Sequence, residues 1–275
     1  PGPRGREMVP LSPEVHLDIA HHPRNEYAQP RELRLHPWLG PAVAEPVLVY
    51  DRDRFFEWVQ AGIRGQVDRP EHVYARARRF LASAREARDR LGAGGRWTRD
   101  YCAAALDAAN AGACLAGPPA AGRRAALILA TRASALEHPE MHEGFLRLLG
   151  ADGPSAWQVP EWLGAWARAF DAASPSSVDP ELALCRRAYY LDGFQALAED
   201  HQDGSIIWPL LTVWERVMAS LVNSPHAADH QAPWVAFLER LRLSPGDAEL
   251  RAGELEVYLD HIEEVIREWA DRNGA

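Results

Sequence analysis

The sequence predicts a mainly α-helical protein with a small sheet near its start. From residue 70 onward, apolar residues recur at helical spacing in segment after segment, and capping residues or prolines stand before several of these segments. The period-two alternation typical of strands occurs only before residue 51. We therefore expect a small, partial α/β unit over residues 1–69, followed by an all-α helical bundle over residues 70–275.

The amino-acid composition argues against some classes of protein function. The 275 residues are 47% hydrophobic, which is enough for one large core or two smaller ones. A net charge of −9 disfavours a general nucleic-acid coat protein, because an acidic surface repels phosphates. The chain has no lysine, so every fixed cation is an arginine, a bias that we attribute to a GC-rich genome. No apolar run reaches the roughly 18 residues of a membrane span.

The three cysteines, Cys102, Cys114 and Cys185, include no close pair. This pattern predicts neither a disulfide framework nor a zinc site. A reducing cytoplasm is the expected setting.

The strand expected over residues 14–20 holds the most informative side chain, Asp18. Apolar residues alternate along this segment, and an unpaired carboxylate within it is costly. We therefore expect a metal, an arginine or a helix end beside Asp18. A second strand is expected over residues 46–50, and residues 1–10 are expected to form a disordered leader.

The helices are expected in the following order. Asp53 is a good N-cap for a helix to about residue 66, and Pro70 is suited to the first turn of a long helix that ends near residue 91. The later helices share capped starts or apolar stripes, and we expect them over residues 98–116, 123–136, 138–149, 160–172, 179–200, 205–221, 232–241 and 248–270. The last of these has the clearest apolar stripe: Leu255, Tyr258, Leu259, Ile262, Val265, Ile266 and Trp269.

Two parts of the chain together resemble a known superfamily. The segment VHLDIA, the polar stretch ending in His36-Pro37-Trp38, and Leu48-Val49-Tyr50-Asp51 with its following helix resemble the second half of a nucleotidyltransferase core. The relevant superfamily contains the kanamycin- and aminoglycoside-type nucleotidyltransferases and DNA polymerase beta. Residues 108–119, Gly122-Arg123-Arg124 and residues 189–194 resemble the HEPN-like helical bundle appended to such cores. The resemblance covers most of the chain.

The resemblance implies a metal-assisted reaction. In this superfamily a Gly-Ser turn holds the nucleotide phosphates, and three carboxylates hold two Mg²⁺ ions. Asp18 matches the third carboxylate, so it would be a catalytic residue and a metal ligand. Asn110, Arg123, Arg124 and Tyr190 would bind the substrate in the cleft between core and bundle. No Gly-Ser followed by Asp-x-Asp precedes Asp18, so this chain alone is not expected to assemble the two-metal site.

Two functions stay open at this point. One is transfer of a nucleoside monophosphate from a nucleoside triphosphate to a hydroxyl, using Mg²⁺, if the missing block lies upstream. The other is a catalytically degenerate helical module that binds a nucleotide, a nucleic acid or a protein. The arginine-rich segment 64–90 fits either a phosphate contact or a solvated face of Arg–Glu pairs. The sequence specifies neither the acceptor substrate nor the oligomeric state.

Overall fold

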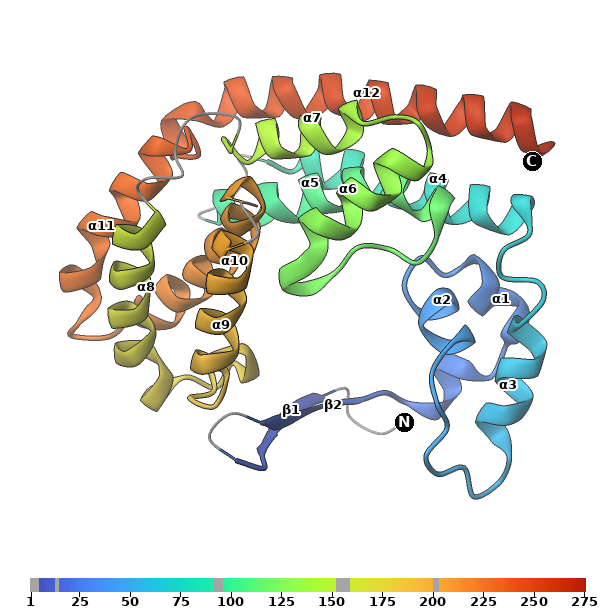
Figure 1. Cartoon of the computed structure of the whole chain (residues 1–275), viewed down its shortest axis with the longest axis horizontal. Helices are drawn as coiled ribbons and strands as arrows, with labels where there is room; N and C mark the ends of the chain where they lie inside the picture. Colours follow the sequence, from blue (N-terminus) through green and yellow to red (C-terminus); the bar gives the residue numbers. More distant parts are fainter. Residues whose placement is uncertain (1–4, 13–14, 92–95, 152–158, 200–202) are drawn as a thin grey trace.

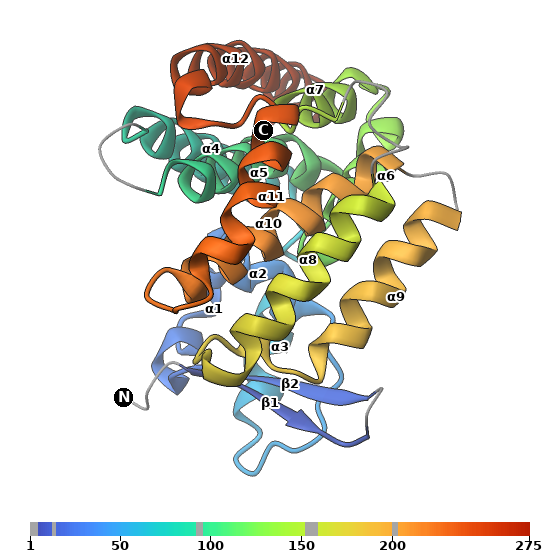
Figure 2. The same cartoon turned by 90° about the vertical axis from the view of Figure 1, so that its left-hand side faces the viewer.

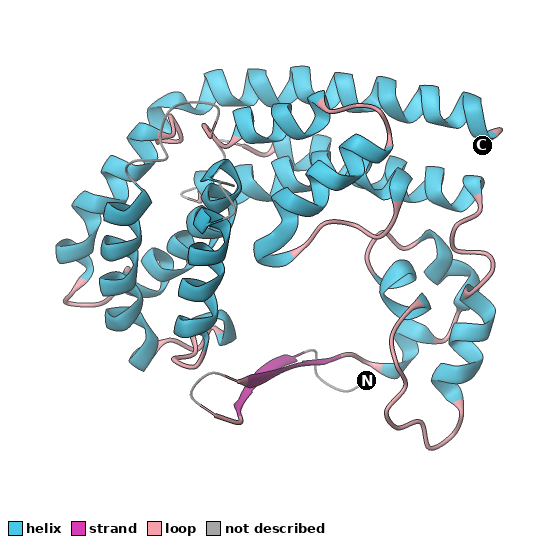
Figure 3. Cartoon of the chain, viewed as in Figure 1, coloured by secondary structure: helices cyan, strands magenta, loops and turns pink. Residues whose placement is uncertain are grey.

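The computed structural model describes residues 5–12, 15–91, 96–151, 159–199 and 203–275. The protein is mainly α-helical, and the only sheet within these described ranges has two strands (Figure 3). The expected fold class is confirmed. None of the described helices is long and apolar enough to cross a membrane.

The first layer of the bundle is built around α4 (Pro70–Asp89) and α5 (Trp97–Ala113), which pack against each other. The long helix α12 (Ala248–Asn273) lies along both of them, and α6 (Ala125–Ala135) and α7 (Glu140–Leu148) complete the layer (Figure 1). Pro70 is the first residue of α4, as expected, because proline fits a position whose N–H has no partner inside the helix. The stripe predicted for α12 faces this core.

The remaining helices form an arm beside this layer (Figures 1 and 2): α8 (Val159–Ala173), α9 (Arg186–Glu199), α10 (Asp203–Leu221) and α11 (Ala227–Arg240). Large aromatic side chains fill the space between them. Trp166 is fully buried and meets Phe194 edge to face, with ring centroids 5.2 Å apart. These aromatic contacts stabilise the arm by burying large apolar areas.

The residues before Pro70 have a small helical core of their own. It lies among α1 (Pro30–Leu35), α2 (Leu39–Ala44) and α3 (Phe55–Ile63). The buried side chains of this core are Tyr27, Leu33, Val43, Ala44, Val59, Ile63 and Val67. The main core begins at Val73 and includes none of them.

The sheet differs from the expectation in which segments form it. β1 (Gly5–Pro10) pairs antiparallel with β2 (His16–His21), with Met8 opposite Asp18. The prediction of a disordered leader is therefore wrong for residues 5–10. The predicted strand over residues 46–50 is also wrong, because this segment pairs with no strand and Val49 is 95% exposed. Local alternation cannot tell whether a partner strand is present.

The cap of α3 is also corrected. Asp51, rather than Asp53, accepts hydrogen bonds from the backbone N–H groups at the start of this helix, those of Phe55 (3.0 Å) and Glu57 (2.9 Å). Asp53 instead forms an ion pair with Arg24. A carboxylate two residues earlier in the chain thus satisfies the free donors of the first turn.

Candidate functional site

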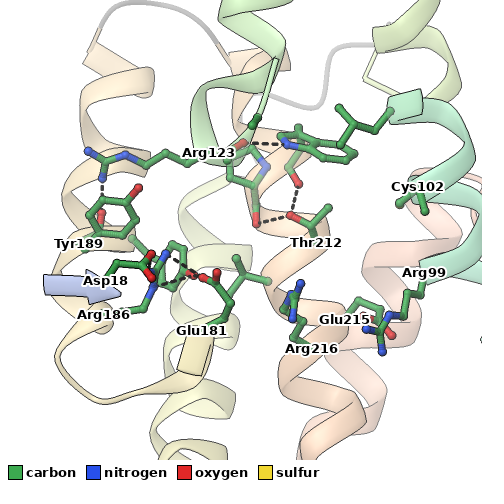
Figure 4. A pocket seen from close by; sticks show the side chains of 18 of the residues that line it. Asp18, Arg99, Cys102, Arg123, Glu181, Arg186, Tyr189, Thr212, Glu215 and Arg216 are labelled. Atoms are coloured by element: carbon green, nitrogen blue, oxygen red, sulfur yellow. Dashed lines mark hydrogen bonds and ion pairs between the residues drawn. The ribbon is translucent and has the colours of Figure 1, made fainter. Parts of the chain in front are cut away.

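A cavity of about 670 Å³ lies between the β1–β2 hairpin, α5, α9 and α10 (Figure 4). Its lining carries five guanidinium groups and three carboxyl groups: Arg6, Arg99, Arg123, Arg186 and Arg216, with Asp18, Glu181 and Glu215. The chain as a whole has a net charge of −9, so this excess of positive groups is local.

Asp18 enters the cavity from β2 and is held by two arginines. Arg6, on the neighbouring strand, donates to both of its carboxylate oxygens. Arg186 of α9 reaches Asp18 Oδ2 with its Nη1 at 3.1 Å. An arginine was one of the partners expected for this carboxylate, and two arginines contact it. The hydrogen bond from Arg6, together with the charge of Arg186, holds the pKa of Asp18 below its usual range.

Glu181 extends the same network on the helical side. It lies in a 3₁₀ turn, Pro180–Leu182, and its own backbone N–H donates to the side chain of the predicted cap Asp179. The helix α9 itself begins only at Arg186. Glu181 accepts from Tyr190 Oη, pairs with Arg186 at 2.7 Å and also pairs with Arg6. The hairpin is therefore attached to the helical arm through charged groups.

The hairpin adds no buried apolar side chain to this attachment, because none of the described residues in its two strands is fully buried. An isolated two-stranded hairpin is marginally stable in water. The position of the hairpin therefore depends on the ionic network of Arg6, Asp18, Glu181 and Arg186.

The residues around Asp18 do not fit the magnesium site implied by the resemblance. Both oxygens of Asp18 already accept from arginines, and the nearby Glu181 is engaged in the same way. Within the described ranges, no three histidine, cysteine, aspartate or glutamate side chains are grouped so that they could hold a metal ion. Magnesium binding by Asp18 stays a prediction, which the arginine pairing opposes.

Arg123 lines the cavity from the turn before α6. Its guanidinium lies over the ring of Tyr189, 3.9 Å from the ring centroid, and donates to the backbone carbonyl of the same residue. Gly193, one turn farther along α9, makes room for it, because a Cβ there would collide with the guanidinium. No carboxylate pairs with Arg123 among the residues that the structure describes, in contrast to Arg6, Arg186 and Arg216.

Two predicted substrate-binding residues do not line the cavity. Asn110 is fully buried, and its amide group bonds to both the N–H (2.6 Å) and the carbonyl (3.0 Å) of Ala120. Arg124 is exposed on the surface. The structure brings three of the five predicted residues to the cavity: Asp18, Arg123 and Tyr190.

Sequence reasoning missed the opposite wall, which α5 and α10 provide. Arg99, Cys102, Ala103 and Leu106 line the cavity from α5 and recur at the spacing of one helix face. The same spacing on α10 brings Pro209, Thr212, Val213 and Arg216 to the cavity. Both sets read as ordinary amphipathic stripes. The one sequence feature that could have indicated a cavity wall was the arginine within each stripe, Arg99 and Arg216.

Glu215 is the third carboxyl group of the lining. It is half-buried and has no hydrogen-bond partner within the described part of the chain. Burial raises its pKa, and the charges of Arg99 and Arg216 oppose this shift only in part. The ionised form of Glu215 is therefore disfavoured by its surroundings, whereas the ionised form of Asp18 is favoured.

The arginine-rich segment 64–90 is mostly neutralised where it meets α12. Arg78 pairs with Glu263 at 2.6 Å, and Arg88 pairs with Glu256 at 3.0 Å. Arg85 pairs with Glu263 as well. Of the two interpretations of this segment, these contacts favour a solvated face of ion pairs.

Comparisons with protein-family models, with curated proteins and with solved structures found no match.

Proposed function

We propose that this chain binds a small anionic molecule in the cavity between the hairpin and helices α5, α9 and α10. The observation that carries the proposal is Arg123. Its guanidinium lines the cavity and has no carboxylate partner among the described residues, whereas Arg6, Arg186 and Arg216 each have one. A positive group in such a position is best satisfied by an anion from outside the chain.

The rest of the lining supports the same sign of charge. Five guanidinium groups face three carboxyl groups, so the lining carries more positive than negative groups. His16 adds a buried Nδ1 that finds no hydrogen-bond partner among the residues that the structure describes. A buried polar atom without a partner costs free energy, which a bound polar ligand would recover.

This proposal develops the second of the two functions considered above, a helical module that binds a ligand. Nucleotidyl transfer stays a prediction. The engagement of Asp18 by Arg6 and Arg186 gives it no support, because the reaction implied by the resemblance needs this carboxylate on a metal.

Isothermal titration calorimetry tests the proposal. The titrants are acetate, inorganic phosphate, and ATP with and without Mg²⁺. The proteins are the wild type, Arg123→Gln and Arg124→Gln. Loss of one charged hydrogen-bond donor costs about 1.5–3 kcal/mol, so Arg123→Gln should weaken binding of the preferred anion roughly 10- to 100-fold.

Arg124→Gln is the matched control, because it removes the same charge from the adjacent, exposed position outside the cavity. It should bind as the wild type does. Equal weakening in both variants, or no heat with any of these anions, would refute the proposal. Circular dichroism of each variant confirms that the fold is retained.

A further inference from the structure

The cavity has an apolar side as well as a charged one. The α5 face passes from Arg99 at one end to Cys102, Ala103 and Leu106, and none of these three is charged. Across from it, Trp208, Pro209 and Val213 of α10 line the same cavity. Figure 4 labels two residues of the α5 face: Arg99 lies beside Glu215, and Cys102 lies away from the ion pairs.

Burial strengthens the apolar character of this side. Cys102 is 5% exposed, and burial raises the pKa of its thiol, so it stays protonated and neutral. Water at such a surface makes few hydrogen bonds. A ligand that displaces this water with an apolar group gains about 25 cal/mol for each Å² of apolar surface removed from water.

The size of the cavity excludes a bare ion as its full occupant. Cavities that hold organic ligands range from about 300 to 1,000 Å³, and this one measures about 670 Å³. The balance of charges in the lining limits how much negative charge the headgroup of the ligand can carry. Asp18, Glu181 and Asp179 neutralise three of the five guanidinium groups, and Arg99 lies near Glu215, which leaves Arg123 for the ligand.

From these observations we infer that the ligand is an amphipathic monoanion, an organic carboxylate with an acyl or aryl body. The carboxylate lies beside Arg123, and the apolar body lies against Ala103 and Leu106 of α5 and Val213 of α10. This inference rests on the proposed function, and it adds the second requirement, the apolar body.

A ligand series separates the two requirements. Acetate, butanoate, hexanoate and hexanol are titrated into the wild type. Each added methylene should tighten binding of the carboxylates roughly two- to fourfold, until the apolar side is filled. Hexanol, which has the body without the charge, should bind at least tenfold more weakly than hexanoate.

Two variants test where the apolar body lies. Ala103→Leu fills the apolar side, and because Ala103 is exposed on α5 the change leaves the core intact. It should weaken hexanoate binding about tenfold and leave acetate binding unchanged. Ala82→Leu makes the same substitution at an exposed position of α4 outside the cavity and should bind both ligands as the wild type does.

The outcomes that oppose the two proposals are distinct. If hexanoate binds no more tightly than acetate while acetate binding still depends on Arg123, the inference is overturned and the proposed function stands. If hexanol binds as tightly as hexanoate, the anionic headgroup, and with it the proposed function, is overturned. Equal loss of hexanoate binding in Ala103→Leu and Ala82→Leu would overturn the placement of the ligand against α5.

Discussion

Asn110→Ala is expected to destabilise the protein strongly, because the amide of Asn110 is the partner of both backbone groups of Ala120. Both residues are buried, with exposed fractions of 0% and 1%. The substitution would leave an N–H and a carbonyl without partners, at about 1–3 kcal/mol each. Together they should lower the free energy of unfolding by about 2–6 kcal/mol, a large share of the about 5–15 kcal/mol typical of natural proteins.

Urea denaturation at 25 °C, followed by circular dichroism, measures this loss. Asn273→Ala is the matched control, because that asparagine is exposed near the end of α12 and bonds only to a carbonyl of its own helix. It should change stability by less than about 0.5 kcal/mol. A loss below about 1 kcal/mol for Asn110→Ala, or equal losses in the two variants, would refute the structural role that we assign to Asn110.

Three further predictions concern the hairpin, a turn and the chemistry. Asp18→Asn should speed amide hydrogen exchange in β1 and β2 about tenfold, whereas Glu7→Gln, whose ion pair lies within the hairpin, should not. Because the pKa of Asp18 is lowered, its contribution is complete above about pH 4 and is lost as the pH falls, so the difference in exchange between the wild type and Asp18→Asn should disappear there. Gly150→Ala should lower the free energy of unfolding, measured by urea denaturation, by at least about 3 kcal/mol, because φ is +66° and a Cβ would collide with the carbonyl of Leu241. The control Gly246→Ala, where a Cβ would meet open space, should lower it by less than about 1 kcal/mol. Labelled ATP, Mg²⁺ and hydroxyl acceptors should give no acceptor labelling; labelling that disappears in Asp18→Ala would contradict this.

The sequence predicted the helices after Pro70 well, because most of them have several turns and a repeated apolar stripe is a strong signal. It did not predict α1 and α2, which have only six residues each. The stripe of α12 shows this, since Leu255, Leu259 and Ile262 are all fully buried as expected. Strands gave a weaker signal. β1 has little apolar alternation and is held through the charge of Arg6, so no pattern marked it. The segment 46–50 has the alternation but no partner.

The candidate site was predicted only in part. Asp18 could be singled out because a carboxylate in an apolar strand needs a partner, and that partner proved to be arginine. Asn110 was expected in the cleft because the resemblance assigned it a substrate-binding role, but a resemblance carries no information on where the side chain lies in this chain. The structure places it in the core beside Ala120. The wall made by α5 and α10 could not be predicted, because Arg99 and Arg216 come together only through tertiary packing that no local period encodes.

The ionic attachment of the hairpin also constrains how the chain folds. Arg6 and its partner Glu181 are 175 residues apart in the sequence, so the hairpin is synthesised well before the helical arm that holds it. Closing so long a loop carries an entropic cost before the contact forms, and no described residue of the two strands is a fully buried apolar side chain that would bring the hairpin in early. The hairpin should therefore dock last, and the cavity would be completed only after the helices on its other sides have folded.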